Sequence, residues 1–272
     1  MGWGMMVHMA LSPLKFCASL SALSVLPGLG ACTSSGSAET RVEQLQPEII
    51  ATHPFDPTSF TQGLEMDGSG NLLVGTGMVG ESRVYRSTLD GEQLQTEDLD
   101  TEFFGEGITV HGADLWQLTW QDGVAVKRDT ETLAETARFP LEGQGWGICS
   151  RQDELLLSDG TAELERLDPD TFTAHDTVTV TLNGEPVDGL NELECVGDEV
   201  YANVFLSTDI MRIDAASGEV TAVIDASNLP NNAADHPDNV LNGIAAVDGG
   251  ESFLLSGKRW PDLYEVSLVP AN

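Results

Sequence analysis

Basic residues are scarce in this chain of 272 residues, which has 12 Lys and Arg against 44 Asp and Glu and a formal net charge of −32. Such an acidic molecule repels phosphate groups, so the composition argues against a nucleic-acid partner. Aromatic residues are also few, at 6%, but hydrophobic residues reach 41%, which is enough for a folded core. The high charge opposes self-association, and we expect a monomer.

Metal-binding patterns are missing as well. Beyond residue 31 the histidines are His53, His111, His175 and His236, and they are scattered along the chain. The sequence has no H-x-x-H, H-E-x-x-H or C-x-x-C spacing. Because these are the spacings that commonly hold zinc, we expect no metal site and no cofactor requirement for catalysis.

The N-terminal residues have the composition of a signal peptide. Residues 1–31 contain no Asp or Glu, and their single basic residue, Lys15, precedes an apolar run over residues 16–29. A positive start, a short apolar stretch and then small residues are typical of secretory signals. The run is too short to span a membrane comfortably. We therefore predict that residues 1–31 are removed and that the protein is exported.

A cysteine follows this segment directly, in the sequence LGAC at residues 29–32. These residues resemble the bacterial lipobox, in which the cysteine becomes the lipidated N-terminus. We predict lipidation of Cys32, with residues 32–42 as a flexible tether that is mostly small and polar. The acyl chains would hold the protein on a membrane of the cell envelope, facing outward or into the periplasm. An ordinary signal peptide followed by a chance cysteine is the alternative.

Two cysteines, Cys149 and Cys195, remain in the predicted mature protein. Export exposes them to an oxidising environment, in which they can form a disulfide. Two buried free thiols are equally compatible with the sequence. The pairing therefore stays open at this point.

Five related segments recur along the rest of the chain. They read FTQGLEM, FGEGITV, QGWGICS, LNELECV and LNGIAAV, and their register positions are Gly63, Gly107, Gly147, Glu192 and Gly243. Each segment precedes a second and a third strand-like run, and a fourth run closes every unit except the last. Alternating apolar residues separated by turn residues favour strands over helices.

Units of about 40–50 residues with four strands each are typical of propeller blades. The strand missing from the fifth unit is predicted upstream, at residues 47–54, where it would close the ring by completing the last blade. We predict an all-β, five-bladed β-propeller with four-stranded blades over residues 43–272. An open β-solenoid is the alternative, and it would leave the fifth unit one strand short.

Innermost propeller strands line a central channel, so polar residues at matching positions of these strands are candidate site residues. Glu106 lies between two glycines, where a carboxylate is costly to bury unless it is paired or functional. Each candidate also has a simpler, purely structural interpretation. The amides would bind backbone groups, the tryptophans would pack in the core and the lysine would form a salt bridge. The other candidates, from the inner strands and from the ends of the second strands, are Gln62, Trp146, Asn191, Trp120, Phe205 and Lys258.

Taken together and in order, the motifs resemble the plant- and bacterial-type glutaminyl-peptide cyclotransferases. The resemblance covers nearly all of residues 47–270 and includes PFDPTSFTQGL, FGEGIT, QLTW, GWGI, SDGT, LDPDTF, NELE, VYANV, LNGIA and SGKRWPDLYEV. It implies a five-bladed propeller that converts the N-terminal glutamine of peptides or proteins to pyroglutamate and releases ammonia, without a metal. A non-catalytic lipoprotein that binds peptides or glycans on the same propeller is the alternative.

The resemblance also implies roles for individual residues. Glu106 would be the acid/base that shuttles a proton, and Asn191, Lys258 and the tryptophan N–H groups are candidates to stabilise the oxyanion. Two positions depart from the family pattern, because Phe205 stands where tryptophan is common and Gln144 where glutamate often precedes GWG. The side chains implied to bind substrate are Phe60, Gln62, Trp120, Trp146 and Phe205.

Overall fold

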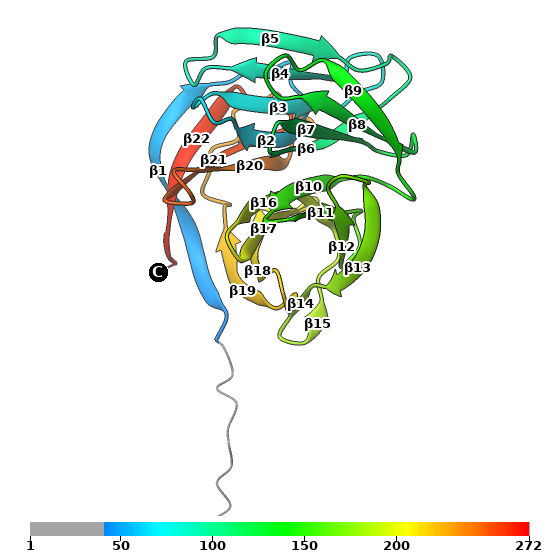
Figure 1. Ribbon diagram of the computed structural model, residues 1–272. Coiled ribbons are helices and arrows are strands. Elements are labelled where there is room, and N and C mark those ends of the chain that lie inside the picture. Colours follow the sequence, from blue (N-terminus) through cyan, green and yellow to red (C-terminus); the bar gives the residue numbers. More distant parts are fainter. Residues whose placement is uncertain (1–40, 272) are drawn as a thin grey trace, which may run out of the picture. The chain divides into compact units, whose positions relative to one another are not determined.

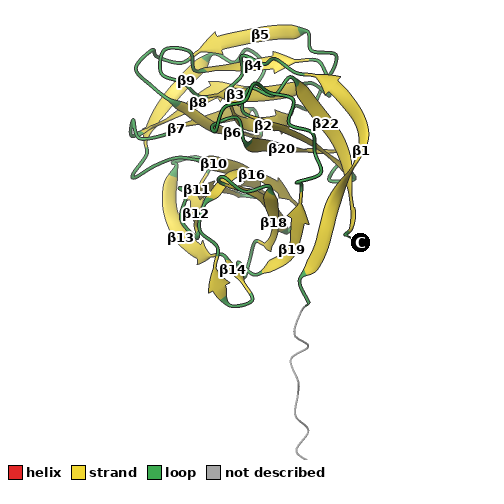
Figure 2. Cartoon of the chain, turned by 180° about the vertical axis from the view of Figure 1, so that it is seen from behind, coloured by secondary structure: helices red, strands yellow, loops and turns green. Residues whose placement is uncertain are grey.

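The computed structural model describes residues 41–271. The predicted signal peptide at residues 1–31, the lipidation of Cys32 and residues 32–40 of the predicted tether lie outside this range. Within residues 41–271 the chain forms strands and loops without a helix, so the prediction of an all-β protein is confirmed (Figure 2). Accordingly, this part of the chain offers no helix with the length and apolar character needed to cross a membrane.

Three sheets have four antiparallel strands each, paired in chain order. The first contains β2 (Thr61–Met66), β3 (Leu72–Thr76), β4 (Arg83–Ser87) and β5 (Gln93–Asp98). The second contains β6 (Gly105–His111), β7 (Asp114–Thr119), β8 (Val124–Asp129) and β9 (Glu135–Pro140). The third contains β10 (Gly147–Arg151), β11 (Glu154–Ser158), β12 (Glu163–Asp168) and β13 (Thr173–Thr179).

The remaining long strands form one sheet of eight. Its first half is β16 (Leu190–Val196), β17 (Glu199–Val204), β18 (Asp209–Asp214) and β19 (Val220–Asp225). Its second half is β1 (Glu43–Pro54), β22 (Asp262–Pro270), β21 (Ser252–Gly257) and β20 (Leu241–Val247). β14 (Thr181–Leu182) and β15 (Glu185–Pro186) form a separate two-stranded sheet.

The N-terminal strand joins the two ends of the described chain. As predicted, β1 pairs with the last strand, β22, antiparallel from Leu45 opposite Pro270 to Pro54 opposite Asp262 (Figure 1). The sequence did not predict that β1 also pairs in parallel with β19, from Glu43 to Leu45. This second pairing covers the outer edge of β19, and it is what merges eight strands into one sheet.

The first strand of each four-strand series lies at the centre of the arrangement. These strands contact one another in the cyclic order β2, β6, β10, β16 and β20, and β20 contacts β2 again. Glycine at the register positions permits this crowding, since a Cβ atom on Gly107 would lie 2.8 Å from the Trp146 carbonyl oxygen. A Cβ atom on Gly147 would collide with the Asn191 carbonyl oxygen. The glycines of the repeat are therefore required by close backbone approach.

Apolar side chains fill the spaces between neighbouring sheets. Ile108 in β6 packs in a cluster with Leu73 and Val84 of the preceding sheet. Trp116 in β7 is fully buried and stacks on Phe172, with ring centroids 4.6 Å apart. Each sheet is therefore covered by its neighbours, which leaves the two ends of the central strands to carry polar groups.

Cys149 in β10 and Cys195 in β16 form a disulfide. The two strands belong to adjacent sheets, so the bond links neighbouring inner strands across a sequence separation of 46 residues. The sequence allowed two free thiols equally well, and the structure decides for the disulfide.

Candidate functional site

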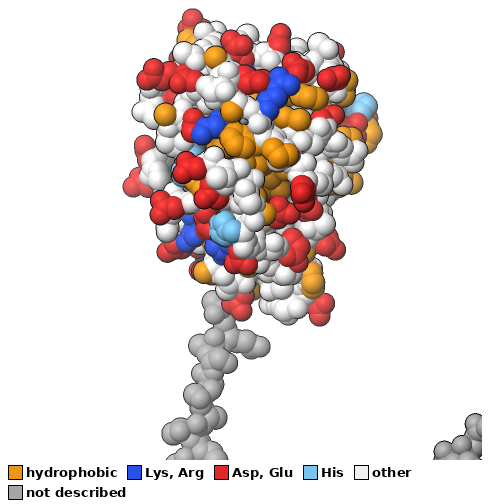
Figure 3. All heavy atoms as spheres, turned by 45° about the vertical axis from the view of Figure 1, so that its right-hand side comes forward, with side chains coloured by type: hydrophobic (Ala, Val, Ile, Leu, Met, Phe, Trp, Pro, Cys, Tyr) orange, Lys and Arg blue, Asp and Glu red, His pale blue; other side chains and the backbone are white. Residues whose placement is uncertain are grey.

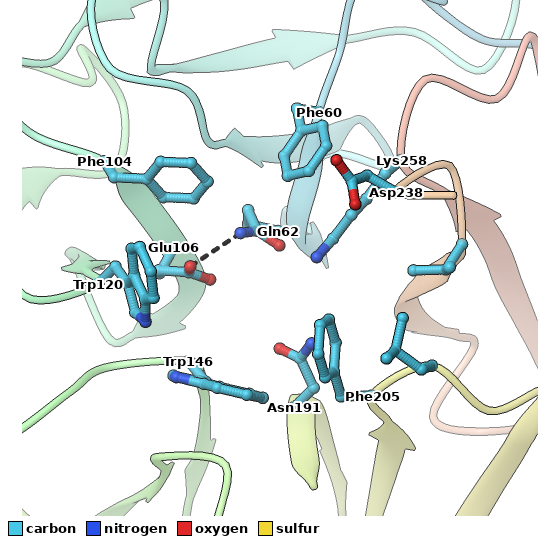
Figure 4. A pocket seen from close by; sticks show the side chains of 12 residues that line it. Phe60, Gln62, Phe104, Glu106, Trp120, Trp146, Asn191, Phe205, Asp238 and Lys258 are labelled. Carbon is cyan, nitrogen blue, oxygen red and sulfur yellow. Dashed lines mark hydrogen bonds between the residues drawn. The ribbon is translucent and has the colours of Figure 1, made fainter. Parts of the chain in front are cut away.

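A cavity of about 220 Å³ opens at one end of the central strands (Figure 4). Phe104, Leu206, Asp238 and Val240 contribute to its lining and were not predicted from the sequence. The other lining residues are all eight side chains that the sequence analysis selected, namely Phe60, Gln62, Glu106, Trp120, Trp146, Asn191, Phe205 and Lys258.

Equivalent places in the repeat bring these side chains together. Gln62, Glu106 and Asn191 are each the second residue of an inner strand. The pairing of each of these strands with its neighbour is irregular across that residue, and β20 is irregular in the same way at Asn242. A bulge re-aims the side chain that it carries and is common beside active sites. The irregularities therefore mark the places where polar side chains leave the strand pattern and face the cavity.

The ends of the second strands supply a further set of lining residues. Trp120, Phe205 and Lys258 each follow directly after the last residue of β7, β17 and β21. Trp146 immediately precedes the inner strand β10. The structure therefore places these four side chains together in the lining of the cavity.

Glu106 is the buried carboxyl group of the cavity, with 5% of the residue exposed. Gln62 Nε2 donates a hydrogen bond of 2.8 Å to Glu106 Oε1. Burial raises the pKa of Glu106 well above its ordinary value, and the positive charge of Lys258 opposes part of this rise. A raised pKa brings the carboxyl group closer to the pKa of an amine, which favours proton exchange between the two groups.

A chain of amides holds Gln62 in its orientation. Asn242 Nδ2 donates to Gln62 Oε1 at 3.0 Å and to the Thr61 carbonyl oxygen at 3.1 Å. With its oxygen engaged in this way, the Gln62 amide presents its Nε2 to Glu106. Asn242 thus positions Gln62, and through it the catalytic candidate Glu106.

Lys258 enters the cavity from the side opposite Glu106, and Gln62 lies between them in Figure 4. Lys258 is 5% exposed, and its Nζ lies 5.0 Å from the centre of the Phe60 ring and 5.5 Å from that of Phe205. Burial lowers the pKa of Lys258, whereas Glu106 and Asp238 raise it. Within residues 41–271 Lys258 forms no direct ion pair, so the salt-bridge interpretation has no support there, and its charge acts on Glu106 at longer range.

Aromatic rings form the walls around these polar groups. Phe60 meets Phe104 edge to face, with ring centroids 6.0 Å apart, and Phe104 in turn meets Trp120 at 5.8 Å. On the other side Trp146 meets Phe205 at 5.3 Å. Rings packed in this way provide an apolar surface for methylene groups, and Trp120 and Phe205 remain 39% and 42% exposed.

The two indole N–H groups are already occupied by one glutamine. Trp120 Nε1 donates to Gln144 Oε1 at 2.7 Å, and Trp146 Nε1 donates to the same oxygen at 3.3 Å. This geometry contradicts the sequence-based expectation that tryptophan N–H groups are available to an oxyanion. Gln144, noted from the sequence only as a departure from the family pattern, instead fixes both rings.

Unpaired polar atoms occur on the inner strands β16 and β20 and on the neighbouring strand β17. Asn191 is 4% exposed and lines the cavity, and its Oδ1 has no hydrogen-bond partner among the described residues. The same holds for Asn242 Oδ1 and for Asn203 Nδ2. Buried polar atoms normally have partners, so these groups are available to a ligand or to water.

A second group of carboxylates lies on the inner strands away from the cavity lining. Glu192 accepts hydrogen bonds from the main-chain N–H groups of Leu64 and Ile244, at 3.2 and 2.9 Å. Glu65 accepts one from Thr109 Oγ1 at 2.9 Å, and burial raises the pKa of Glu65 to about 7. Residues 41–271 contain no group of three or more His, Cys, Asp or Glu residues arranged to hold a metal ion.

Comparison with known proteins shows the family of this chain. The model of the glutamine cyclotransferase family matches residues 22–268. The chain is 35% identical over 247 residues to the glutaminyl-peptide cyclotransferase of Arabidopsis thaliana. This match covers 88% of this chain and 77% of that protein. The crystal structure of Myxococcus xanthus glutaminyl cyclase is similar with a TM-score of 0.81 and 34% identity, over 85% of this chain and 100% of that one. The chain therefore belongs to the glutamine cyclotransferase family.

Proposed function

We propose that this protein is a glutaminyl-peptide cyclotransferase, which converts the N-terminal glutamine of a peptide or protein to pyroglutamate and releases ammonia. The observation that carries the proposal is that a buried carboxyl group, Glu106, and a buried cation, Lys258, line one aromatic cavity. The relatives from Arabidopsis thaliana and Myxococcus xanthus, named for this activity, support it.

The size of the cavity suits a single residue. Its volume of about 220 Å³ is smaller than the roughly 300–1,000 Å³ that is usual for drug-sized ligands. In the reaction, the α-amine of glutamine attacks the amide carbon of its own side chain and closes a five-membered ring. Because both reacting groups belong to one residue, the cavity has only to hold the rotamer in which they meet.

Glu106 is proposed to move the proton that the reaction requires. A free α-amine has a pKa of about 8 and is mostly protonated at neutral pH, so attack requires that a proton be removed. The nitrogen of the side-chain amide must gain a proton to leave as ammonia. The protonated amine first loses one proton to solvent, and the neutral amine then attacks the amide carbon. Glu106 takes the second proton from the attacking nitrogen and gives it to the leaving nitrogen, and the raised pKa of Glu106 brings it closer to that of the amine.

Lys258 and Asn191 are proposed to stabilise the tetrahedral intermediate. Lys258 is the only cation among the residues that line the cavity, and its charge favours the oxygen that becomes negative. Asn191 presents an unpaired amide oxygen, which suits the N–H groups of the substrate's side-chain amide. Phe60, Trp120, Trp146 and Phe205 would pack the substrate's methylene groups.

We also propose that the fold is a five-bladed propeller. The eight-stranded sheet divides at its parallel β19–β1 pair into two blades, of which one is β16 to β19 and the other is β20 to β22 with β1. The cyclic contacts of five inner strands support this division. Domain boundaries at residues 43–272, removal of residues 1–31, lipidation of Cys32, export to the cell envelope and a monomeric state remain proposals from the sequence.

The decisive test measures ammonia released from a Gln-initiated dipeptide, with and without a chelator. We expect release that resists the chelator, because groups of the cavity itself supply the proton transfer and the positive charge. Glu106→Gln should lower kcat by about 10²- to 10⁴-fold, the usual value of acid–base assistance. Glu65→Gln, at an inner-strand carboxylate outside the cavity lining, is the matched control and should retain activity.

Two outcomes would contradict the proposal. Binding of the dipeptide without any release of ammonia would support the non-catalytic peptide-binding alternative. Full turnover by the Glu106→Gln variant would remove Glu106 from the proton transfer and leave the reaction without the proposed base.

A further inference from the structure

A loop outside the sequence repeat completes the mouth of the cavity. Residues 226–240 connect β19 to β20. Asp238 and Val240 of this loop line the cavity. The loop thus adds a second acidic side chain, Asp238, to a lining that already contains Glu106.

The loop is held firmly next to Asp238. Asn239 is buried, and its Nδ2 donates to the Ala234 carbonyl oxygen at 2.8 Å. The Asn239 carbonyl oxygen accepts from Asn231 Nδ2 at 2.8 Å and from Trp260 Nε1 at 3.1 Å. Because its neighbour in the chain is fixed by three hydrogen bonds, Asp238 has a defined position at the cavity.

Asp238 is the solvent-facing acid of the cavity. Its side chain is 63% exposed, whereas Glu106, the other acid of the lining, is buried. In Figure 4 the Asp238 carboxyl group lies beside the Lys258 side chain. The main-chain N–H of Asp238 donates to His236 Nδ1 at 3.2 Å, and the same ring nitrogen lies 3.6 Å from the Asp238 carboxyl group. The carboxylate is therefore oriented, yet accessible from solvent.

An apolar surface lies with Asp238 in the lining of the cavity. Phe205 and Leu206 both line the cavity, and Leu206 is 66% exposed. Leu206 lies in a turn after β17 with a positive φ of 63°, closed by a hydrogen bond of 3.0 Å from the Ser207 N–H to the Val204 carbonyl oxygen. The turn therefore directs the large apolar side chain of Leu206 toward solvent at the mouth of the cavity.

We infer that Asp238, together with the apolar surface of Phe205 and Leu206, selects peptides with lysine or arginine directly after the N-terminal glutamine. The inference rests on the proposed function. A cavity of one-residue size places the second residue at the mouth, because consecutive Cα atoms are about 3.8 Å apart. Lysine and arginine have an apolar stem, which packs on Phe205 and Leu206, and a cationic end, which reaches the Asp238 carboxylate.

The effect on selectivity should be modest, because Asp238 is exposed. Exposed ion pairs change an equilibrium by about 1.5- to 5-fold. The overall charge of −32 also attracts every basic peptide, so selectivity due to Asp238 must be separated from this general attraction. A control that removes one negative charge from the same loop without touching the cavity achieves this separation.

The test compares kcat/KM for ammonia release from Gln-Lys, Gln-norleucine and Gln-Glu peptides that are otherwise identical. Norleucine keeps the apolar stem of lysine and lacks its charge. In the unmodified protein we expect Gln-Lys to be preferred over Gln-norleucine, and Gln-Glu to be the poorest substrate. Asp238→Asn should lower the Lys-to-norleucine ratio by about 1.5- to 5-fold at low salt. Asp235→Asn, an exposed position of the loop outside the cavity lining, should leave that ratio unchanged.

The outcomes separate this inference from the proposed function. Equal ratios in all three proteins, with normal ammonia release, would overturn the role of Asp238 and leave the proposed function intact. Equal losses in Asp238→Asn and Asp235→Asn would assign the preference to overall charge and overturn the inference as well. The absence of release from every peptide would refute the proposed function, and this inference with it.

Discussion

Replacing Lys258 by methionine tests the electrostatic coupling in the cavity. Methionine keeps most of the side-chain volume and removes the charge. Lys258 favours the ionised form of Glu106, so its removal raises the pKa of Glu106 beyond the increase that burial already causes. If the ionised Glu106 is the base, activity is lost as pH falls through its pKa. The acid limb of the pH profile of kcat/KM must therefore move to higher pH in Lys258→Met.

The magnitude follows from the separation and burial of the two charges. Both residues are 5% exposed, so salt and water screen them weakly. At an effective dielectric constant of about 20, two unit charges interact by about 4 kcal/mol at 4 Å and by about 2 kcal/mol at twice that distance, and Glu106 and Lys258 lie beyond the range of a direct ion pair. One pKa unit corresponds to about 1.4 kcal/mol, so we expect a shift of about 1–2 pH units. The plateau rate should also fall, by about 10²- to 10³-fold, if Lys258 stabilises the oxyanion.

The assay is ammonia release from a Gln-initiated dipeptide between pH 5 and 9. Lys127→Met is the matched control, since Lys127 pairs with Asp114 on β7 and lies outside the cavity lining. Its acid limb should coincide with that of the unmodified protein. An acid limb that stays in place in Lys258→Met, or moves to lower pH, would refute the coupling even if the rate falls.

Two further predictions concern stability. Replacing Cys149 and Cys195 together by serine opens a covalent link across 46 residues, and by the loop-entropy model this should cost about 4 kcal/mol in urea unfolding. An unchanged unfolding midpoint under non-reducing conditions would mean that the disulfide does not form. Burial raises the pKa of Glu65 to about 7 from an ordinary value of 4.5. Between these two pH values the folded state binds more protons than the unfolded state, so the free energy of unfolding falls as pH rises from about 4.5 to 7. In Glu65→Gln this fall should be smaller by about 1–3 kcal/mol, as measured by urea unfolding at pH 5 and pH 8, and an identical fall would show that Glu65 titrates normally.

The sequence determined the strands, their repeat and the identity of most cavity residues. Alternation of apolar residues decides which face of a strand is buried, and the recurring glycines mark where inner strands approach. Glu106 between two glycines and Lys258 after an apolar run stood out because charged groups are costly at such places. These are local patterns, so they can be recognised without knowing which segments meet.

Only the tertiary structure decided how these residues act on one another. Gln144 binds both indoles, Asp238 reaches the cavity from a loop outside the repeat, and β1 pairs with β19 as well as with β22. The Cys149–Cys195 bond likewise depends on two inner strands lying side by side. Apart from the local hydrogen bond between Gln144 and Trp146, each of these contacts joins segments far apart in the chain. Their formation depends on how the sheets close around the centre, which a periodic pattern within one unit does not specify.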